Sequence, residues 1–224
     1  MAQPPDHHEP KIRHAVILCH PSPHSFCRSI ATAYCDEVER NGQEWVLRDL
    51  YALDFDPVLR DDERPAVGAD PKHDVARELT QLSGCDVFTL IYPIWFGSAP
   101  AMLKGYIDRV FGSGVTPQNV LLQNRIGFLT GRWLFSISTS ATKDIWLDEQ
   151  GQLGSMRQGF DHYIAHAFGM HLEKHMHFGH ILPGAKTRWI DQYLYEVREQ
   201  TKRVCAMVLA QARHAQAAAI EPVA

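Results

Sequence analysis

The sequence has no apolar run long enough for a membrane helix. Every apolar stretch in the 224-residue chain falls short of the roughly 18 residues that such a helix needs. The N-terminus, MAQPPDHHEPK, is polar and proline-rich and lacks the apolar core of a signal peptide. These absences predict no membrane insertion, a cytoplasmic location and a disordered tail over residues 1–12.

Basic patches, paired cysteines and the common nucleotide motifs are also missing. The formal net charge is −4, and no long run of Lys or Arg occurs, so nucleic acid is not an expected partner. The five cysteines contain no C-x-x-C pair, which favours a reduced, cytoplasmic protein over a disulfide scaffold. Neither G-x-G-x-x-G nor G-K-[ST] is present, so a dinucleotide fingerprint or a nucleoside triphosphate loop is not supported.

The composition is that of an ordinary globular domain. Hydrophobic residues make up 45% of the chain and charged residues 21%, which is enough to bury a sizeable core. No internal repeat or linker divides the chain. The sequence therefore predicts one domain over residues 13–218.

Apolar strands alternate with amphipathic helices along this domain. Continuous apolar runs such as Ala15–Leu18 and Val87–Ile91 are typical of parallel strands buried on both faces. Five alternations of strand and helix predict an α/β doubly wound, five-stranded parallel sheet with helices on both faces. The predicted strands are 15–18, 45–47, 87–91, 133–140 and 171–178; the predicted helices are 25–41, 75–82, 100–111, 155–168 and the segment from 187, with a long loop over 52–70.

In open α/β sheets, ligands bind beyond the carboxyl ends of the strands. After the first predicted strand comes HPSPHSFCR, residues 20–28, which places hydroxyls, a histidine and an arginine at the start of a helix. Free backbone N–H groups and the helix dipole favour a phosphate there. Plain capping of the helix by Ser25 is the alternative, and the residues leave it open.

Two further loops follow the third and fourth strands. The turn after the third strand contains Trp95 and Phe96 between Pro93 and Gly97; these rings are either core aromatics or a surface for a flat ligand. An isoalloxazine ring needs an apolar face together with hydrogen bonds along its rim. The small hydroxyl residues of 136–142 can line the other rim, so three loops at one edge favour a flavin.

Three motifs on these loops resemble the NAD(P)H:quinone oxidoreductases of the flavodoxin-like fold. They are H-P-x-x-x-S-F, Y-P-I-W-F-G-x-x-P-A-M-L-K-G-Y-I-D-R-V-F and S-T-S, and the resemblance extends from about Arg13 to about Ala210. It implies a flavoprotein homodimer that takes hydride from NADPH or NADH and reduces quinone-like acceptors by two electrons. It favours FAD slightly over FMN.

The resemblance also assigns roles to residues. The phosphate and ribityl end of the flavin would lie on His20, Ser25, Phe26 and Cys27, although the family often has Asn at the position of Cys27. The ring would lie on Pro93, Ile94, Trp95 and Phe96. Its other rim would meet Ser138, Thr139 and Ser140.

One departure from the family concerns catalysis. Relatives carry a Tyr and a His after the fourth strand, where this chain has Trp146 and Gln152. Neither side chain can act as an acid at ordinary pH. The sequence therefore predicts flavin-centred chemistry without a side-chain relay, unless His162 or Tyr163 folds back, and leaves charge stabilisation to backbone N–H groups.

Other interpretations remain beside this one. A noncatalytic flavodoxin-like electron carrier or a regulatory subunit of an ion transporter is the alternative function. Four histidines at 171, 175, 177 and 180 suggest a metal site, but solvated side chains on an exposed edge strand are the expectation, with no metal. The homodimer prediction rests on the helix 100–111, whose apolar residues cover more than one face.

Overall fold

The structure is a computed structural model that describes residues 9–64, 70–122 and 127–220. Five parallel strands form one sheet in the order β2-β1-β3-β4-β5. The predicted doubly wound, five-stranded parallel sheet is confirmed. The strands are β1 (Arg13–Leu18), β2 (Glu44–Asp49), β3 (Val87–Pro93), β4 (Trp133–Thr139) and β5 (His171–Phe178).

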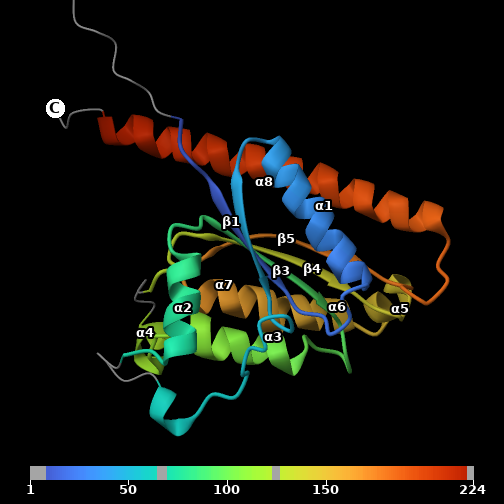
Figure 1. Cartoon of the computed structure of the whole chain (residues 1–224), viewed down its shortest axis with the longest axis horizontal. Coiled ribbons are helices and arrows are strands. Elements are labelled where there is room, and N and C mark those ends of the chain that lie inside the picture. Colours follow the sequence, from blue (N-terminus) through green and yellow to red (C-terminus); the bar gives the residue numbers. More distant parts are fainter. Residues whose placement is uncertain (1–8, 65–69, 123–126, 221–224) are drawn as a thin grey trace, which may run out of the picture.

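Helices cover both faces of the sheet. The helices α1 (Phe26–Arg40) and α8 (Thr187–Ile220) lie on one face, and α3 and α7 lie on the other (Figure 1). The remaining bounds are η1 (Asp61–Glu63), α2 (His73–Leu82), α3 (Ala101–Tyr106), η2 (Ile107–Phe111), α4 (Pro117–Leu121), α5 (Asp144–Glu149), α6 (Gln152–Met156), η3 (Arg157–His162) and α7 (Tyr163–Ala167). None of the described helices is both long and apolar enough to cross a membrane.

The sheet separates two hydrophobic cores, as a strand buried on both faces requires. Ala15 and Ile17 of β1 belong to the core beneath α2 and α3. The residues between and after them, Val16 and Leu18, belong to the core beneath α1 and α8. The period of two in a strand sends successive side chains to opposite faces, and the all-apolar run of β1 therefore has no polar side.

Some helix boundaries differ from the sequence prediction. The predicted helix 100–111 becomes a π-helix from Ile107, and the predicted helix 155–168 begins earlier, at Gln152, and also contains a π segment, η3. The helices α4 and α5 were not predicted, because elements of five and six residues are too short to set up a recognisable 3.6-residue period. The prediction of a disordered tail falls mostly on residues 1–8, outside the described residues.

The motive for the homodimer prediction does not hold. The apolar side chains of α3 and η2 are buried inside their own chain, where Tyr106 and Phe111 pack against each other at 6.0 Å between ring centroids. A close contact explains part of this burial: a Cβ on Gly105 would lie 2.1 Å from the carbonyl oxygen of Pro57. The helix therefore packs tightly on the loop after β2 and leaves little surplus apolar area for a partner.

Candidate functional site

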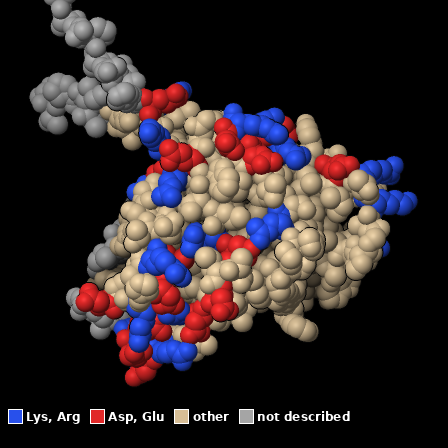
Figure 2. Space-filling view, viewed as in Figure 1, with Lys and Arg blue, Asp and Glu red and all other residues tan. Residues whose placement is uncertain are grey.

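The three loops identified from the sequence meet at the carboxyl ends of β1, β3 and β4. The backbone N–H of Cys19 donates to the carbonyl of Ile91 at 2.9 Å, and the N–H of Ile94 donates to the carbonyl of Thr139 at 2.7 Å. Figure 2 shows charged side chains gathered over α2 and η1, whereas the end of the molecule where the strands finish is mostly uncharged. The edge thus offers a largely uncharged surface for a ligand.

The first loop forms a capped helix N-terminus. The Ser25 hydroxyl accepts from the N–H of Arg28 at 3.2 Å, so the capping interpretation is correct for this side chain. Beyond that cap, the N–H groups of Phe26 and Cys27 have no acceptor among the described residues, and no acidic residue occupies the first turn. Such a terminus attracts an anion.

His20 and Cys27 of this loop both contact other residues of the protein. The His20 Nδ1 atom accepts from the N–H of Ser22 at 3.0 Å, and its ring meets Trp95 edge-on at 6.1 Å. Cys27 is buried, and its sulfur lies 3.3 Å from the Thr139 hydroxyl. Burial raises the pKa of the Cys27 thiol to about 11, so Cys27 is a neutral packing residue at ordinary pH.

The second loop presents its aromatic rings to solvent. Trp95 and Ser98 exchange two backbone hydrogen bonds, at 2.9 and 3.1 Å, around a two-residue turn. Both turn residues have positive φ, 50° at Phe96 and 79° at Gly97. Trp95 is 38% exposed and Phe96 is fully exposed. The alternative that these rings are core aromatics is therefore wrong.

The three hydroxyls expected in the third loop lie at the end of β4, with Ser138 and Thr139 in the strand itself, and they have different partners. Ser138 is completely buried, and its hydroxyl lies between His175 and His177. Thr139 contacts Cys27, and the Ser140 hydroxyl donates to the carbonyl of Thr142 at 2.8 Å. The Ser138 side chain is thus not available to a ligand at this edge, whereas Ser140 directly follows the last residue of β4.

A buried polar chain runs behind this loop, and the sequence interpretation missed it. His175 Nδ1 lies 2.5 Å from Asp161 Oδ2, and Ser136 donates to Asp161 Oδ1 at 2.6 Å. Ser138 Oγ lies 2.7 Å from His175 Nε2 and 2.8 Å from His177 Nδ1. Ser140 Oγ then lies 3.1 Å from His177 Nε2. Asp161 is 1% exposed and His175 is 8% exposed.

The expectation that these histidines are solvated is wrong for His175 and His177. The register shifts between Leu134 and Ser136, where a single residue of β4 lies opposite a pair of residues of β5. This bulge reverses the alternation of side chains, so His175 and His177 face η3 instead of sharing a side with His171. His171 remains exposed and stacks on Trp133 at 4.9 Å. The sequence signal that could have predicted this burial is the spacing of two serines, at 136 and 138, on the strand that neighbours the histidines at 175 and 177.

Burial sets the charge states of this region. Desolvation lowers the pKa of His177 to about 4, and the nearby charges of His175 and Arg157 act in the same direction, so His177 is neutral at ordinary pH. Burial, with the Asp161 charge as a smaller cause, raises the pKa of Tyr92 well above its usual value. The Tyr92 phenol beside His175 therefore stays protonated.

Trp146 and Gln152, which occupy the family's Tyr and His positions, lie apart from the buried polar side chains around His175. Trp146 is half exposed on α5. Gln152 begins α6 and lines a cavity of about 420 Å³ together with Gly97, Ser98 and Lys104. His162 and Tyr163, the residues that could have folded back, are both exposed. No group of three or more His, Cys, Asp or Glu side chains among the described residues is arranged to hold a metal ion.

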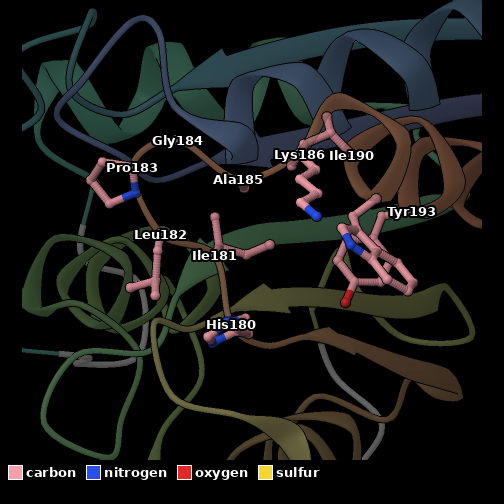
Figure 3. Close-up of a pocket in the computed structure, with 10 residues that line it drawn as sticks. His180, Ile181, Leu182, Pro183, Gly184, Ala185, Lys186, Ile190 and Tyr193 are labelled. Atoms are coloured by element: carbon pink, nitrogen blue, oxygen red, sulfur yellow. The ribbon is translucent and has the colours of Figure 1, made fainter.

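A second cavity, of about 460 Å³, adjoins the candidate site (Figure 3). The loop from His180 to Ala185 forms one wall, and Ile190 and Tyr193 of α8 form the other. Trp189 of the same helix also lines the cavity. The N–H groups of His180 and Ile181 donate to the carbonyls of Thr142 and Ser140, both at 2.9 Å. Tyr193 packs near Phe26 at the start of α1, at 6.2 Å between ring centroids. The cavity therefore borders both the first and the third loop.

Comparison with known proteins gives the family and the fold. The family model described as "Flavodoxin-like fold" matches residues 13–201. A Haemophilus influenzae protein named as an uncharacterized NAD(P)H oxidoreductase is 37% identical over 105 residues, which are 46% of this chain and 52% of that protein. The guinea pig (Cavia porcellus) NAD(P)H dehydrogenase [quinone] 1 is 26% identical over 153 residues, 60% of this chain and 55% of that protein. The matched part of the chain thus spans about half the length of these relatives.

Solved structures agree on the fold. The NAD(P)H:quinone oxidoreductase from Methanothermobacter marburgensis superposes with a TM-score of 0.76 at 22% identity, covering 87% of this chain and 96% of that one. An FMN-dependent NADH-azoreductase from Bacillus anthracis, in complex with FMN, superposes with a TM-score of 0.59 at 15% identity, covering 87% and 99%. At these identities the likeness establishes the arrangement of strands and helices.

Proposed function

The chain belongs to the flavodoxin-like fold family, and from that premise we propose that it is a flavin-dependent NAD(P)H oxidoreductase that reduces quinones or similar acceptors by two electrons. The observation that carries the proposal is the exposed Trp95–Phe96 turn beside the open N-terminus of α1. The names of the relatives, NAD(P)H oxidoreductases and quinone dehydrogenases, support the same chemistry.

The residues present fit a flavin. The N–H groups of Phe26 and Cys27 lack acceptors within the described residues, and the first turn of α1 contains no carboxylate, which suits a phosphate. Trp95 and Phe96 offer apolar faces for a planar ring. The backbone of Ile94 and the loop after Thr139 would complete the pocket. A bound flavin supplies hydride acceptance from NAD(P)H and hydride donation to the acceptor.

The protein's own contribution is then binding, orientation and exclusion of water. The backbone pairing of Trp95 with Ser98 holds the aromatic turn in one shape. The contact between Cys27 and Thr139 fixes the first loop against the third. Because contacts within the protein itself hold both loops, little ordering entropy should be lost on binding.

The second cavity supports FAD over FMN. Its volume of about 460 Å³ lies beside the start of α1, and Trp189, Ile190 and Tyr193 provide apolar and aromatic walls. An adenosine group beyond the flavin phosphate would find a stacking surface there. FMN would leave this cavity without a ligand.

The test is to purify the protein, record its visible spectrum and measure the mass of the released flavin. The expected result is a yellow protein with one noncovalent flavin per chain that oxidises NADPH or NADH when a quinone is added. Colourless protein that refuses added FMN and FAD would refute the proposal. Bound flavin without NAD(P)H oxidation would favour the noncatalytic electron carrier.

A further inference from the structure

The buried polar chain behind β4 has a direction that its hydrogen bonds determine. Five side chains take part: Asp161, His175, Ser138, His177 and Ser140. At one end, Ser140 Oγ lies 2.8 Å from the carbonyl oxygen of Thr142. A carbonyl oxygen only accepts hydrogen bonds, so the single hydrogen of the Ser140 hydroxyl is used there.

Each following bond then has only one possible donor. Because Ser140 has no hydrogen left, His177 Nε2 must carry the hydrogen in their contact. Neutral His177 then has a bare Nδ1, so Ser138 must donate to it. Ser138 has in turn no hydrogen for His175, and His175 Nε2 must donate to Ser138.

The last bond holds one extra proton. His175 Nε2 carries a hydrogen, yet His175 Nδ1 also lies 2.5 Å from Asp161 Oδ2. Two bare acceptors would repel each other at this distance, so a proton must lie between them. The pair is thus either imidazolium with carboxylate or neutral imidazole with carboxylic acid. Ser136 donates to the other carboxylate oxygen and leaves Oδ2 for this proton.

The two ends of the chain face different surroundings. Ser140 lies at the carboxyl end of β4, at the edge where the proposed function places the flavin and its acceptor. His175 and His177 line a separate cavity of about 490 Å³. The charged groups that face this cavity are Asp144 and Asp148 from α5, Arg157 from η3, Lys174 from β5 and Glu196 from α8.

We propose that this row of hydrogen-bonded side chains is a proton relay. It stores one proton at the Asp161–His175 pair and delivers that proton at Ser140 during reduction of the acceptor. The inference rests on the proposed function, in which hydride from NAD(P)H and one proton together convert a quinone to a hydroquinone. Asp161, His175, Ser138 and His177 are positioning residues that act through Ser140. The Tyr and His of relatives are replaced by a chain drawn from β4, β5 and η3.

The transfer moves one proton through the relay, and no side chain is oxidised or reduced. The Ser140 O–H bond breaks as the acceptor takes the proton, and Ser140 receives the hydrogen of His177 Nε2. His177 Nδ1 receives the hydrogen of Ser138, and Ser138 receives that of His175 Nε2. His175 is left neutral with Nδ1–H bonded to the Asp161 carboxylate, and every bond in the chain is reversed.

The relay takes up its next proton from the cavity that His175 and His177 line. When Ser140 turns back to the Thr142 carbonyl, His177 Nε2 is free to take a proton from water in the cavity, near Asp144 Oδ1 at 3.8 Å. The pKa of His177, lowered to about 4 by burial, makes it a poor place to keep that proton. The proton therefore passes through Ser138 to His175, which restores the starting state.

The first test needs no flavin. Long-range 1H–15N NMR at neutral pH reports which nitrogen of each histidine carries hydrogen, and His175→Gln and His177→Gln assign the signals. The expected result is hydrogen on Nε2 of both residues and a shared or full proton on His175 Nδ1. Hydrogen on His177 Nδ1, or a bare His175 Nε2, would overturn the stored proton.

A sharper readout comes from Asp161→Asn. Because Ser136 donates to Oδ1 of Asp161, the amide of this variant keeps its oxygen there and turns its NH2 group toward His175 Nδ1. An NH2 group only donates, so His175 should become neutral with hydrogen on Nε2 only, while His177 keeps its hydrogen on Nε2. A proton that persists on His175 Nδ1 in this variant would contradict the storage of a proton at the Asp161–His175 pair.

The second test measures delivery in the flavin-loaded protein. Ser138→Ala interrupts the hydrogen-bonded chain without removing a histidine, and turnover should fall roughly 100-fold. The loss should grow as the pH rises, because protons from water become scarcer. The controls are Thr89→Val, which removes another buried strand hydroxyl, and His162→Gln, which removes an exposed histidine next to Asp161. Both should turn over as the unaltered protein does.

The outcomes separate the relay from the proposed function. If Ser138→Ala and the unaltered protein have equal turnover and equal flavin content, proton delivery through Ser140 is refuted. The proposed oxidoreductase function is not affected by that result. If the unaltered protein oxidises no NAD(P)H, the proposed function and the delivery step fail together. The NMR result then decides the stored proton by itself.

Discussion

The backbones of Trp95 and Ser98 pair in both directions, at 2.9 and 3.1 Å, and the turn between them holds Phe96 at a φ of 50°. A left-handed conformation costs a non-glycine residue about 1–2 kcal/mol, and the ring of Phe96 is nevertheless fully exposed. Packing of the Phe96 ring against the described residues does not offset this cost, and such strain is typical of functional sites.

Phe96→Gly should therefore raise stability and lower activity together. We expect the free energy of unfolding to rise by about 1 kcal/mol, because glycine adopts positive φ freely. With bound flavin, kcat/KM for a quinone should fall about five-fold, since one aromatic contact is worth about 1 kcal/mol. Denaturant unfolding and steady-state kinetics measure the two effects. Unchanged kcat/KM in a stabilised variant would make Phe96 an ordinary surface residue.

Trp95→Ala should weaken flavin binding. The half-exposed Trp95 ring meets His20 edge-on at 6.1 Å, and loss of its surface should cost on the order of 1–3 kcal/mol of binding free energy. Fluorescence titration of the apoprotein with flavin gives the affinity. Trp45→Ala is the matched control, because Trp45 is similarly exposed on the edge strand β2. Equal affinities in both variants would contradict the role of Trp95.

Tyr106→Ala should act on stability instead of flavin binding. Tyr106 is fully buried, and its hydroxyl donates to Glu78 Oε2 at 2.9 Å. The variant leaves a cavity and removes one hydrogen bond to Glu78 Oε2, which still accepts from Arg48 Nε at 2.8 Å, and the cost should be about 3–5 kcal/mol in the free energy of unfolding. Flavin titration below the melting temperature should give nearly the original affinity, and a loss as large as that in Trp95→Ala would be unexpected.

Trp189→Ala should separate FAD from FMN. Trp189 lines the cavity of about 460 Å³, which we assign to the adenosine part of FAD. We expect about ten-fold weaker binding of FAD, because a stacking contact worth about 1.4 kcal/mol is lost, and unchanged binding of FMN. FMN thus serves as the internal control. Parallel losses for both flavins would place the adenosine elsewhere.

Acidification should destabilise the protein through His14. Its Nδ1 lies 2.7 Å from the Tyr34 hydroxyl and its Nε2 lies 2.8 Å from Gln43 Oε1, and burial lowers its pKa from 6.5 to about 4. Below pH 6.5 the unfolded state binds a proton that the folded state refuses, so stability falls until about pH 4. The loss is about 3 kcal/mol for this residue.

The measurement is the free energy of unfolding as a function of pH, in the unaltered protein and in His14→Gln. The variant cannot titrate at this position, so its stability should fall less steeply between pH 6.5 and about 4. Part of the slope should remain, because the lowered pKa of His177 acts in the same direction. Identical slopes in the two proteins would refute the assignment to His14.

The sequence by itself determined the fold and the edge of the sheet at which the candidate site is proposed. Apolar runs such as Ala15–Leu18 can be buried only in a sheet covered on both sides, and the alternation of strands with helices leaves few topologies. Loops after β1, β3 and β4 must then meet at one edge. The turn around Phe96 and the hydroxyls at the end of β4 could be placed there from the sequence.

Only the tertiary structure decided which side chains face one another. A single extra residue in β5 between Leu172 and His175 reverses the alternation that a regular strand would have, and turns two expected surface histidines inward. Asp161 reaches His175 from a π-helical segment that no periodic pattern reveals. Likewise, the burial of Tyr106 and Phe111 depends on packing against residues distant in sequence. Local patterns specify elements, whereas register and packing specify contacts.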